Sequence, residues 1–238
     1  MAHPEGIVFG DGDHLPDANA LAGLDRETFF ENLVEGDTTA VAHVPGHPGS
    51  TVRLQSPWRE TEANYWTVVK QGIRHFQRME QAGIIVPAQR FVLAPGFDDD
   101  ETPHLYSFTD YLEGRQLTNQ PADAHLAAPV IDGLAKYMRW AYNEPTETEF
   151  LWDKIYPWQF TVRPDNSVIL HDVGLDFRST AKTGRYNISL SIYQSSISLE
   201  EWADQTQIKT PQALKLLMSD IEPPPIHAAR KLIRKVLS

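Results

Sequence analysis

The sequence predicts an α+β fold in two lobes, and three observations lead to this prediction. Up to residue 109, the chain contains several short β-type runs and a single long amphipathic stretch. From residue 118 onward, it contains mostly helical patterns and one β-hairpin, at 160–172. A short connector at 110–117 separates the two parts, as expected of a boundary between lobes.

The composition narrows the classes of function. The 238 residues suffice for a sizeable core, and a charged content of 22% is ordinary for a globular protein. The net charge of −11 argues against nucleic acid or an anionic membrane as a partner. Because cysteine is absent, disulfides and thiolate metal ligands are excluded. The chain has no signal-peptide pattern and no apolar run of about 18 residues, so we expect a cytoplasmic protein.

The first lobe is predicted over 25–109, after a lead-in at 1–24. The lead-in is rich in Gly, Pro, Asp and His, and we expect it to be loosely ordered. Two β-type runs follow, at Thr39–Val44 and Thr51–Gln55. The Pro- and Gly-rich stretch between them predicts a turn that joins antiparallel strands.

One long helix and two more strands complete the first lobe. Apolar residues recur at three- and four-residue steps over Arg59–Gln81, which predicts an amphipathic helix that ends before Gly83. Strands are predicted at Arg90–Leu93 and His104–Thr109, with an acidic loop between them. We therefore expect an antiparallel sheet with one packed helix.

The second lobe is predicted over 118–238 and is mainly helical. A stripe of apolar residues predicts a long helix at His125–Asn143. Shorter helices are predicted at Leu199–Gln205 and Pro211–Ser219. The polar, Gly-containing stretch Ser179–Arg185 is expected to be a mobile loop.

A β-hairpin in the second lobe leads to an aspartate. Its arms are Phe160–Val162 and Val168–Leu170. Pro164 and Asn166 supply the turn, because Pro fixes φ and Asn tolerates the left-handed region. Asp172 follows the second arm after one residue and begins an Asp-Val-Gly tripeptide, a position typical of a carboxylate that holds a metal.

In their order, these features resemble the catalytic core of the protein-kinase-like phosphotransferases, particularly the aminoglycoside and choline kinase branch. The similarity extends from Thr39 to Phe177. It rests on a basic residue in the strand before the long helix, on the connector Tyr111-Leu112-Glu113-Gly114-Arg115-Gln116-Leu117, and on the hairpin that ends in Asp-x-Gly. The resemblance implies a two-lobed kinase-like fold.

The resemblance also implies roles for several residues. Arg53 occupies the position of the basic residue that contacts nucleotide phosphates. Its carboxylate partner is expected at Glu62, with Glu60 as the alternative. Asp110 and Leu112 belong to the connector, whose backbone hydrogen-bonds adenine in this family. Asp172 is expected to hold Mg²⁺. ATP and Mg²⁺ are therefore the expected cofactors.

The catalytic loop departs from the family pattern. The position of the family's Asp, which orients the substrate hydroxyl, falls on Lys154, and the nearest carboxylate is Asp153. Either a one-residue insertion lets Asp153 act as the catalytic base, or the base is missing. Gln159 replaces the Asn that holds a second metal ion, and it keeps an amide oxygen on a longer side chain.

Two functions follow from the resemblance. The first is a divergent small-molecule kinase-like phosphotransferase that moves the ATP γ-phosphoryl group to a hydroxyl-bearing acceptor. The alternative is a catalytically inactive pseudokinase that acts as a nucleotide-binding or protein-interaction module, with a protein as its partner. Lys154 at the base position and the lack of a Gly-x-Gly motif in the first two strands favour the alternative.

Overall fold

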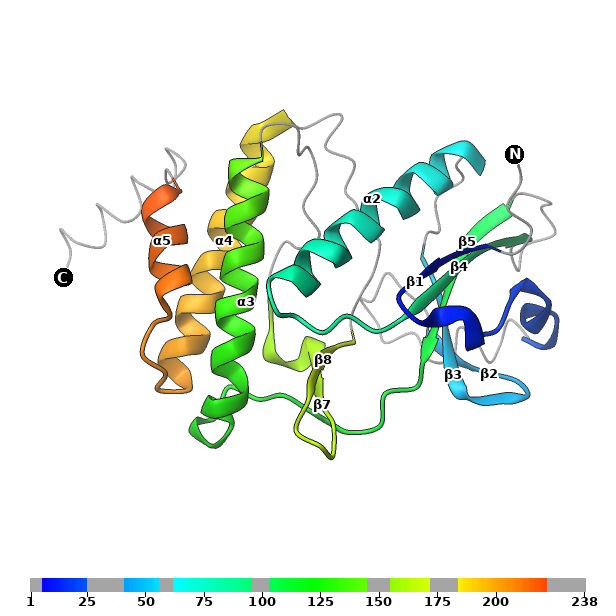
Figure 1. Cartoon of the computed structure of the whole chain (residues 1–238), viewed down its shortest axis with the longest axis horizontal. Coiled ribbons are helices and arrows are strands. Elements are labelled where there is room, and N and C mark those ends of the chain that lie inside the picture. Colours follow the sequence, from blue (N-terminus) through cyan, green and yellow to red (C-terminus); the bar gives the residue numbers. More distant parts are fainter. Residues whose placement is uncertain are drawn as a thin grey trace, which may run out of the picture. The chain divides into compact units, whose positions relative to one another are not determined.

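The computed structural model describes residues 6–24, 41–55, 62–95, 103–144, 155–171 and 184–221. The chain forms two compact units (Figure 1). The first unit consists of Met1–Gln77, Val86–Gly114 and Ile169–Asp176. The second unit consists of Arg78–Ile85, Arg115–Val168 and Phe177–Ser238.

The first unit contains a five-stranded antiparallel sheet. Its strands are β1 (Ile7–Phe9), β2 (Val41–Val44), β3 (His47–Leu54), β4 (Gln89–Pro95) and β5 (Pro103–Asp110). The order across the sheet is β1-β4-β5-β3-β2, so β5 lies between β3 and β4. β2 and β3 are joined by a tight turn in which Gly46 has a φ of 77°, a conformation that glycine adopts without strain. The predicted turn between antiparallel strands is confirmed.

Alternation along the strands gives this sheet two different faces. The even-numbered residues of β3, β4 and β5 form one face, which carries a cluster of fully or almost fully buried apolar side chains: Val52, Val92, Tyr106 and Phe108. Ser50, Arg90 and His104 belong to the same face. The odd-numbered residues form the opposite face, on which α2 (Glu62–Gln81) packs. The rings of Phe9 and Phe76 meet there, with their centroids 5.3 Å apart.

Residues 6–24 correct the prediction of a loosely ordered lead-in over 1–24. β1 pairs with β4, and the short 3₁₀-helices η1 (Gly12–His14) and η2 (Ala18–Gly23) follow it. Leu15 and Leu24 pack into the apolar cluster of the sheet. Elements of three to six residues are too short to produce a hydrophobic period, so the sequence pattern did not reveal them.

Helices dominate the second unit. α3 (Ala124–Asn143), α4 (Gly184–Gln205) and α5 (Gln212–Asp220) pack against one another (Figure 1). Their shared core contains these buried side chains: Leu134, Tyr137, Met138, Leu199, Trp202 and Leu214. The α+β class and the long helix predicted at His125–Asn143 are confirmed.

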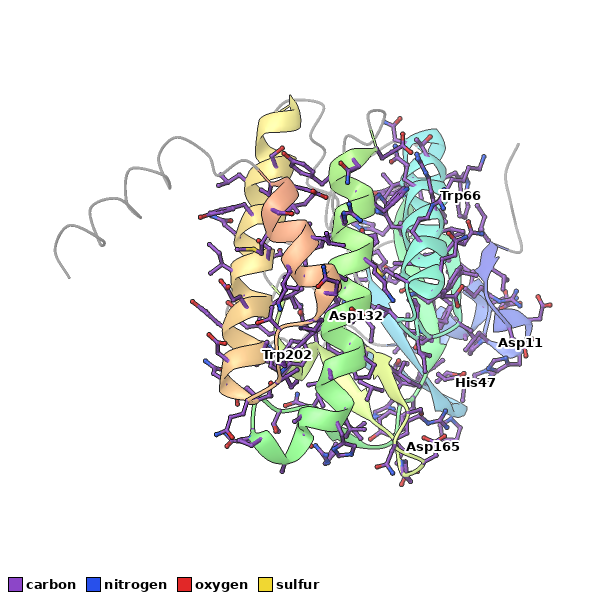
Figure 2. The ribbon with its side chains drawn as sticks, turned by 60° about the vertical axis from the view of Figure 1, so that its left-hand side comes forward. Asp11, His47, Trp66, Asp132, Asp165 and Trp202 are labelled. Atoms are coloured by element: carbon purple, nitrogen blue, oxygen red, sulfur yellow. The ribbon has the colours of Figure 1, made fainter. Side chains whose placement is uncertain are left out.

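The predicted hairpin belongs to a three-stranded sheet. β6 (Arg115–Gln116), β7 (Phe160–Val162) and β8 (Val168–Leu170) lie in the order β6-β7-β8. Asn166 has a φ of 65°, as the turn chemistry predicts. Asp165 lies exposed on the same turn (Figure 2). Its carboxylate accepts hydrogen bonds from the backbone N–H and the hydroxyl of Ser167, which lower the pKa of Asp165.

α4 is longer than predicted. The sequence suggested a loop up to Arg185 and a short helix at Leu199–Gln205, whereas α4 begins at Gly184 and contains 22 residues. Polar residues are scattered around this helix instead of forming one stripe, and Ser195 and Ser196 are fully buried. Because α4 buries several of its faces, the pattern search found no amphipathic period.

None of the helices within the described ranges combines the length and the apolar character needed to cross a bilayer.

Candidate functional site

A polar row runs over four strands on the odd-numbered face of the five-stranded sheet and ends beside β1, where Phe9 is the partner of Gln89. It consists of His43, Thr51, Thr109 and Gln89, which are consecutive partners across β2, β3, β5 and β4. Such cross-strand partners lie about 4.5–5.5 Å apart, so the four side chains are neighbours. An uninterrupted row of polar groups on the face that also receives α2 is not what packing alone would select.

The row changes from exposed to buried along its length. His43 is exposed, and Thr51 and Thr109 are half-buried. Gln89 is only 1% exposed. The hydroxyl of Thr51 donates to the carbonyl of Thr109 at 3.4 Å, and the hydroxyl of Thr109 donates to the carbonyl of Asp110 at 3.0 Å. The two hydroxyl oxygens thus retain acceptor capacity toward a ligand.

Tyr111 borders the row where the connector begins. Its backbone N–H donates to the carbonyl of Gly49 at 2.8 Å, which extends the β3–β5 pairing by one residue. Its ring lies 5.1 Å from the ring of His43, and its side chain is 53% exposed. Tyr111 therefore presents an aromatic surface beside a row of neutral polar groups.

Asp110 and Leu112 were predicted to bind the nucleotide from the connector. Asp110 is paired with Ser50 and so belongs to the opposite, even-numbered face. Its carboxylate Oδ1 lies 2.8 Å from Nε2 of His14, and this contact raises the pKa of His14. Leu112 is half-buried. The Asp110 side chain therefore lies on the face opposite the polar row, and only its backbone could contact a ligand there.

Arg53 lies on the same face as the polar row. It is the cross-strand partner of Ser107, two residues before Thr109 on β5, and it is half-buried. Glu62 is the first residue of α2, but its side chain lies outside the described residues. The Arg53–Glu62 ion pair stays a prediction.

Gln159 has a structural partner for its amide oxygen. It ends η4 (Pro157–Gln159), and its Oε1 accepts a hydrogen bond of 2.8 Å from the backbone N–H of Tyr156. The N–H of Gln159 donates back to the carbonyl of Tyr156 at 3.2 Å. The stacked rings of Tyr156 and Trp158, 4.1 Å apart, stiffen the same turn. The oxygen expected to bind a metal is thus already used to hold this turn.

The described residues do not assemble a magnesium site. Asp153, Lys154 and Asp172 lie outside the described residues. Within the described ranges, no three His, Asp or Glu side chains gather in a way that could hold a metal ion. We therefore derive no step through a metal.

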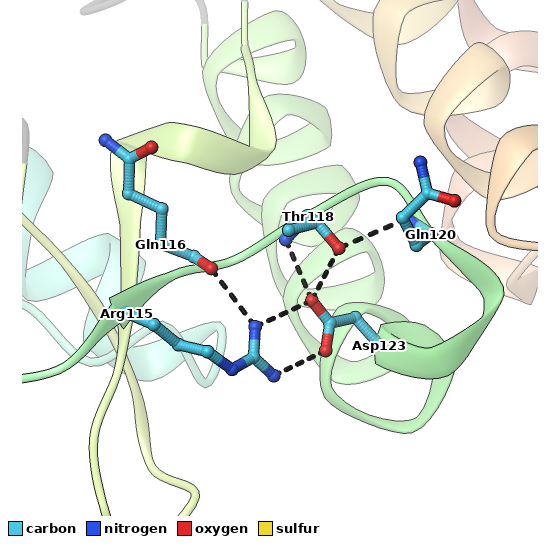
Figure 3. A network of polar contacts seen from close by, with 5 residues as sticks. All are labelled: Arg115, Gln116, Thr118, Gln120 and Asp123. Carbon is cyan, nitrogen blue, oxygen red and sulfur yellow. Dashed lines mark hydrogen bonds and ion pairs between the residues drawn. The ribbon is translucent and has the colours of Figure 1, made fainter.

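A buried carboxylate in the second unit has a structural role that the sequence did not reveal. Asp123 is 4% exposed and forms a two-oxygen contact with the guanidinium of Arg115, at 2.9 and 2.5 Å (Figure 3). It also accepts from the N–H and the hydroxyl of Thr118. The contact with Arg115 is the main cause that lowers the pKa of Asp123 to about 2. This network fixes the segment between β6 and α3.

A shallow groove of about 460 Å³ lies along the last turns of α3 and is lined by Lys136, Arg139, Trp140, Asn143 and Glu144. Lys136 pairs with Asp132 at 2.8 Å, and Arg139 pairs with Asp220 at 2.6 Å. Because these cations already have carboxylate partners, the groove is a poor site for an anion.

The sequence alone does not show that Gln89 and the rest of the polar row form a unit. One signal was present: Gln89 stands between the apolar stretches Val86–Ala88 and Phe91–Leu93, where a strand with two covered faces would be apolar throughout. The pairing that brings it next to Thr109 and Thr51 depends on strand order, which a pattern does not specify.

The chain matches no protein-family model and no curated protein sequence.

Proposed function

We propose that the chain is a divergent small-molecule kinase-like phosphotransferase with two lobes. In this proposal, ATP binds along the odd-numbered face of the five-stranded sheet, and its γ-phosphoryl group moves to the hydroxyl of a small acceptor. Positioning and charge neutralisation supply most of the catalysis in such reactions.

The arrangement of the first unit is the observation that carries this proposal. β3 leads into α2, and the β4–β5 hairpin then inserts β5 beside β3. β5 continues directly into the connector at Tyr111. Arg53 on β3 faces the side on which α2 packs, as a phosphate-binding residue with a helical carboxylate partner requires. The resemblance to the kinase-like family requires at least an antiparallel sheet with one packed helix in the first lobe.

Each residue of the proposal has a stated role. Arg53 binds phosphate, Glu62 pairs with Arg53, and the backbone around Asp110 and Leu112 binds the base. Asp172 holds the Mg²⁺ that accompanies ATP, and Asp153 acts as the base toward the acceptor hydroxyl. Gln159 contributes by holding the turn before β7.

Thermal melting with ATP, with and without Mg²⁺, tests the proposal. Nucleotide at about 100 times its dissociation constant stabilises by about 2.7 kcal/mol. For a chain of this length, the melting temperature should rise by roughly 5–10 °C. The rise should require Mg²⁺ and be lost in Asp172→Ala, whereas Asp165→Ala, an exposed aspartate on the β7–β8 turn, should keep it. Absence of any rise at millimolar ATP contradicts the proposal.

A pseudokinase is the second candidate, and two observations favour it. The Gln159 oxygen accepts a backbone hydrogen bond, and Lys154 stands where the family has its base. Under this alternative, no phosphoryl transfer occurs to any acceptor. ATP raises the melting temperature if the module binds nucleotide, and it leaves the melting temperature unchanged if the module only binds a protein partner. Under the first proposal, Asp153→Ala removes transfer while leaving the ATP-dependent rise in melting temperature unchanged.

A further inference from the structure

Gln89 is buried, and its amide is not satisfied. It begins β4, lies opposite Thr109, and is 1% exposed. Among the residues that the structure describes, neither Oε1 nor Nε2 of Gln89 has a hydrogen-bond partner. More than nine-tenths of buried polar groups in proteins have a partner, so this amide calls for one from outside the described protein groups.

A second buried glutamine on the same face shows the contrast. Nε2 of Gln55 donates to the hydroxyl oxygen of Ser107 at 2.5 Å, and both residues are buried. Gln55 thus has a protein partner, whereas Gln89, two strands away, has none in the described ranges. The difference separates a glutamine whose amide has a partner in the fold from one whose amide has none among the described residues.

The chemistry of the surroundings restricts what that ligand is. The primary amide of Gln89 places an acceptor beside a donor, so its complement is a donor beside an acceptor. The cross-strand partners of Gln89 are Thr109 on β5 and Phe9 on β1, and both are uncharged. These groups suit a flat, uncharged, polar ring and not a phosphate. Glutamine amides recognise the amino group and ring nitrogen of adenine in this two-bond manner.

We propose that Gln89 determines base specificity, by pairing its amide with the amino group and an adjacent ring nitrogen of an aminopurine nucleotide. This inference rests on the proposed function, because it requires that a nucleotide lie along the odd-numbered face. It places the base beside Gln89 and Thr109, at one end of the row. Thr109 directly precedes the connector on β5, and Ser107, the cross-strand partner of Arg53, lies two residues before Thr109.

Calorimetric titration of the parent protein with two nucleotides tests the inference directly. The probes are ATP and purine riboside 5′-triphosphate, which lacks only the 6-amino group. The parent protein should bind ATP about tenfold more tightly than the analogue, because a lost base contact leaves the buried Gln89 oxygen unpaired. The substitution Gln89→Met keeps a similar side-chain shape but removes the hydrogen-bonding groups. In this variant, the affinity for ATP should fall to the affinity for the analogue.

Gln55→Met is the matched control, because it removes a buried amide from the same face. It should keep the tenfold preference for ATP while lowering the melting temperature of the free protein, since Ser107 loses its partner. Gln89→Met should leave the melting temperature of the free protein unchanged or raise it.

Three results would overturn the inference while leaving the proposed function intact. The first is that the parent protein binds ATP no more tightly than the analogue. The second is that Gln89→Met keeps the preference for ATP. The third is that Gln89→Met, without nucleotide, melts as low as Gln55→Met. The last result would mean that buried water already satisfies the amide. If the parent binds neither nucleotide, the proposed function fails as well, and the two failures are thus distinguishable.

Discussion

The two faces of the five-stranded sheet are built from the same strands but are closed in different ways. The even-numbered face carries an apolar cluster that includes Leu15 and Leu24 from the N-terminal segment, and it also contains the buried His104. The odd-numbered face contains a polar row and a buried amide without a partner in the described ranges. The apolar cluster is what packing selects, and the polar row breaks the local rules of packing. Natural chains break such rules mainly where a site needs it.

The largest expected effect comes from the even-numbered face. Phe108→Ala should destabilise the protein by about 3–5 kcal/mol, because Phe108 is 0% exposed and the substitution leaves a cavity. Thr109→Ala, one residue away on the other face, should change stability by less than about 1 kcal/mol. Urea denaturation followed by circular dichroism measures both. Equal losses would show that the two faces are not energetically different.

Leu15→Ala tests whether residues 6–24 belong to the same core. The expected loss is about 2–4 kcal/mol, because this buried side chain packs on the sheet. Asp13→Ala is the control: its side chain is exposed, and the hydrogen bond from Arg90 goes to its backbone carbonyl, which the change preserves. A loss below about 0.5 kcal/mol for Leu15→Ala would return this segment to the status of a loose lead-in.

A buried and an exposed ion pair should also differ in their contribution to stability. Asp123→Asn should lower stability by about 2 kcal/mol near neutral pH, because its pKa falls from 3.8 to about 2 on folding. A lowered pKa contributes stability that is present above the ordinary pKa and is lost as pH falls through about 2. The difference between parent and variant should therefore shrink below pH 3.8. The same change at Asp132 is the control, because Asp132 is half-exposed and forms an ion pair with Lys136 one helical turn away (Figure 2).

The smallest effect is expected for the exposed pair of His14 and Asp110. His14→Gln should cost less than about 1 kcal/mol, since both side chains are substantially exposed. Its pKa is raised in the folded protein, so the contribution is present below the ordinary value of 6.5 and is lost as pH rises through the raised pKa. An NMR titration of His14 in the parent and in Asp110→Asn measures the shift. An identical pKa in both proteins would show that the contact contributes nothing.

Much of the fold could be predicted from local patterns. The turn at Gly46, the helix α3 and the hairpin with Asn166 follow from backbone chemistry and from periods that lie within a few residues of sequence. The segment 6–24 and the length of α4 could not be predicted in this way. Their side chains are buried by residues distant in sequence, and neither segment has an amphipathic period.

The candidate site, too, could be predicted from the sequence only in part. The residue types at Arg53, Gln89 and Gln159 are given by the sequence, which also predicted a strand that contains Arg53 and one that begins at Arg90, next to Gln89. The tertiary structure was needed to show that Gln89 lies beside Thr109, and that the Gln159 oxygen accepts a hydrogen bond from the backbone of Tyr156. The physical reason is that strand order and cross-strand register are set by contacts between distant segments, and they decide which polar groups find a partner.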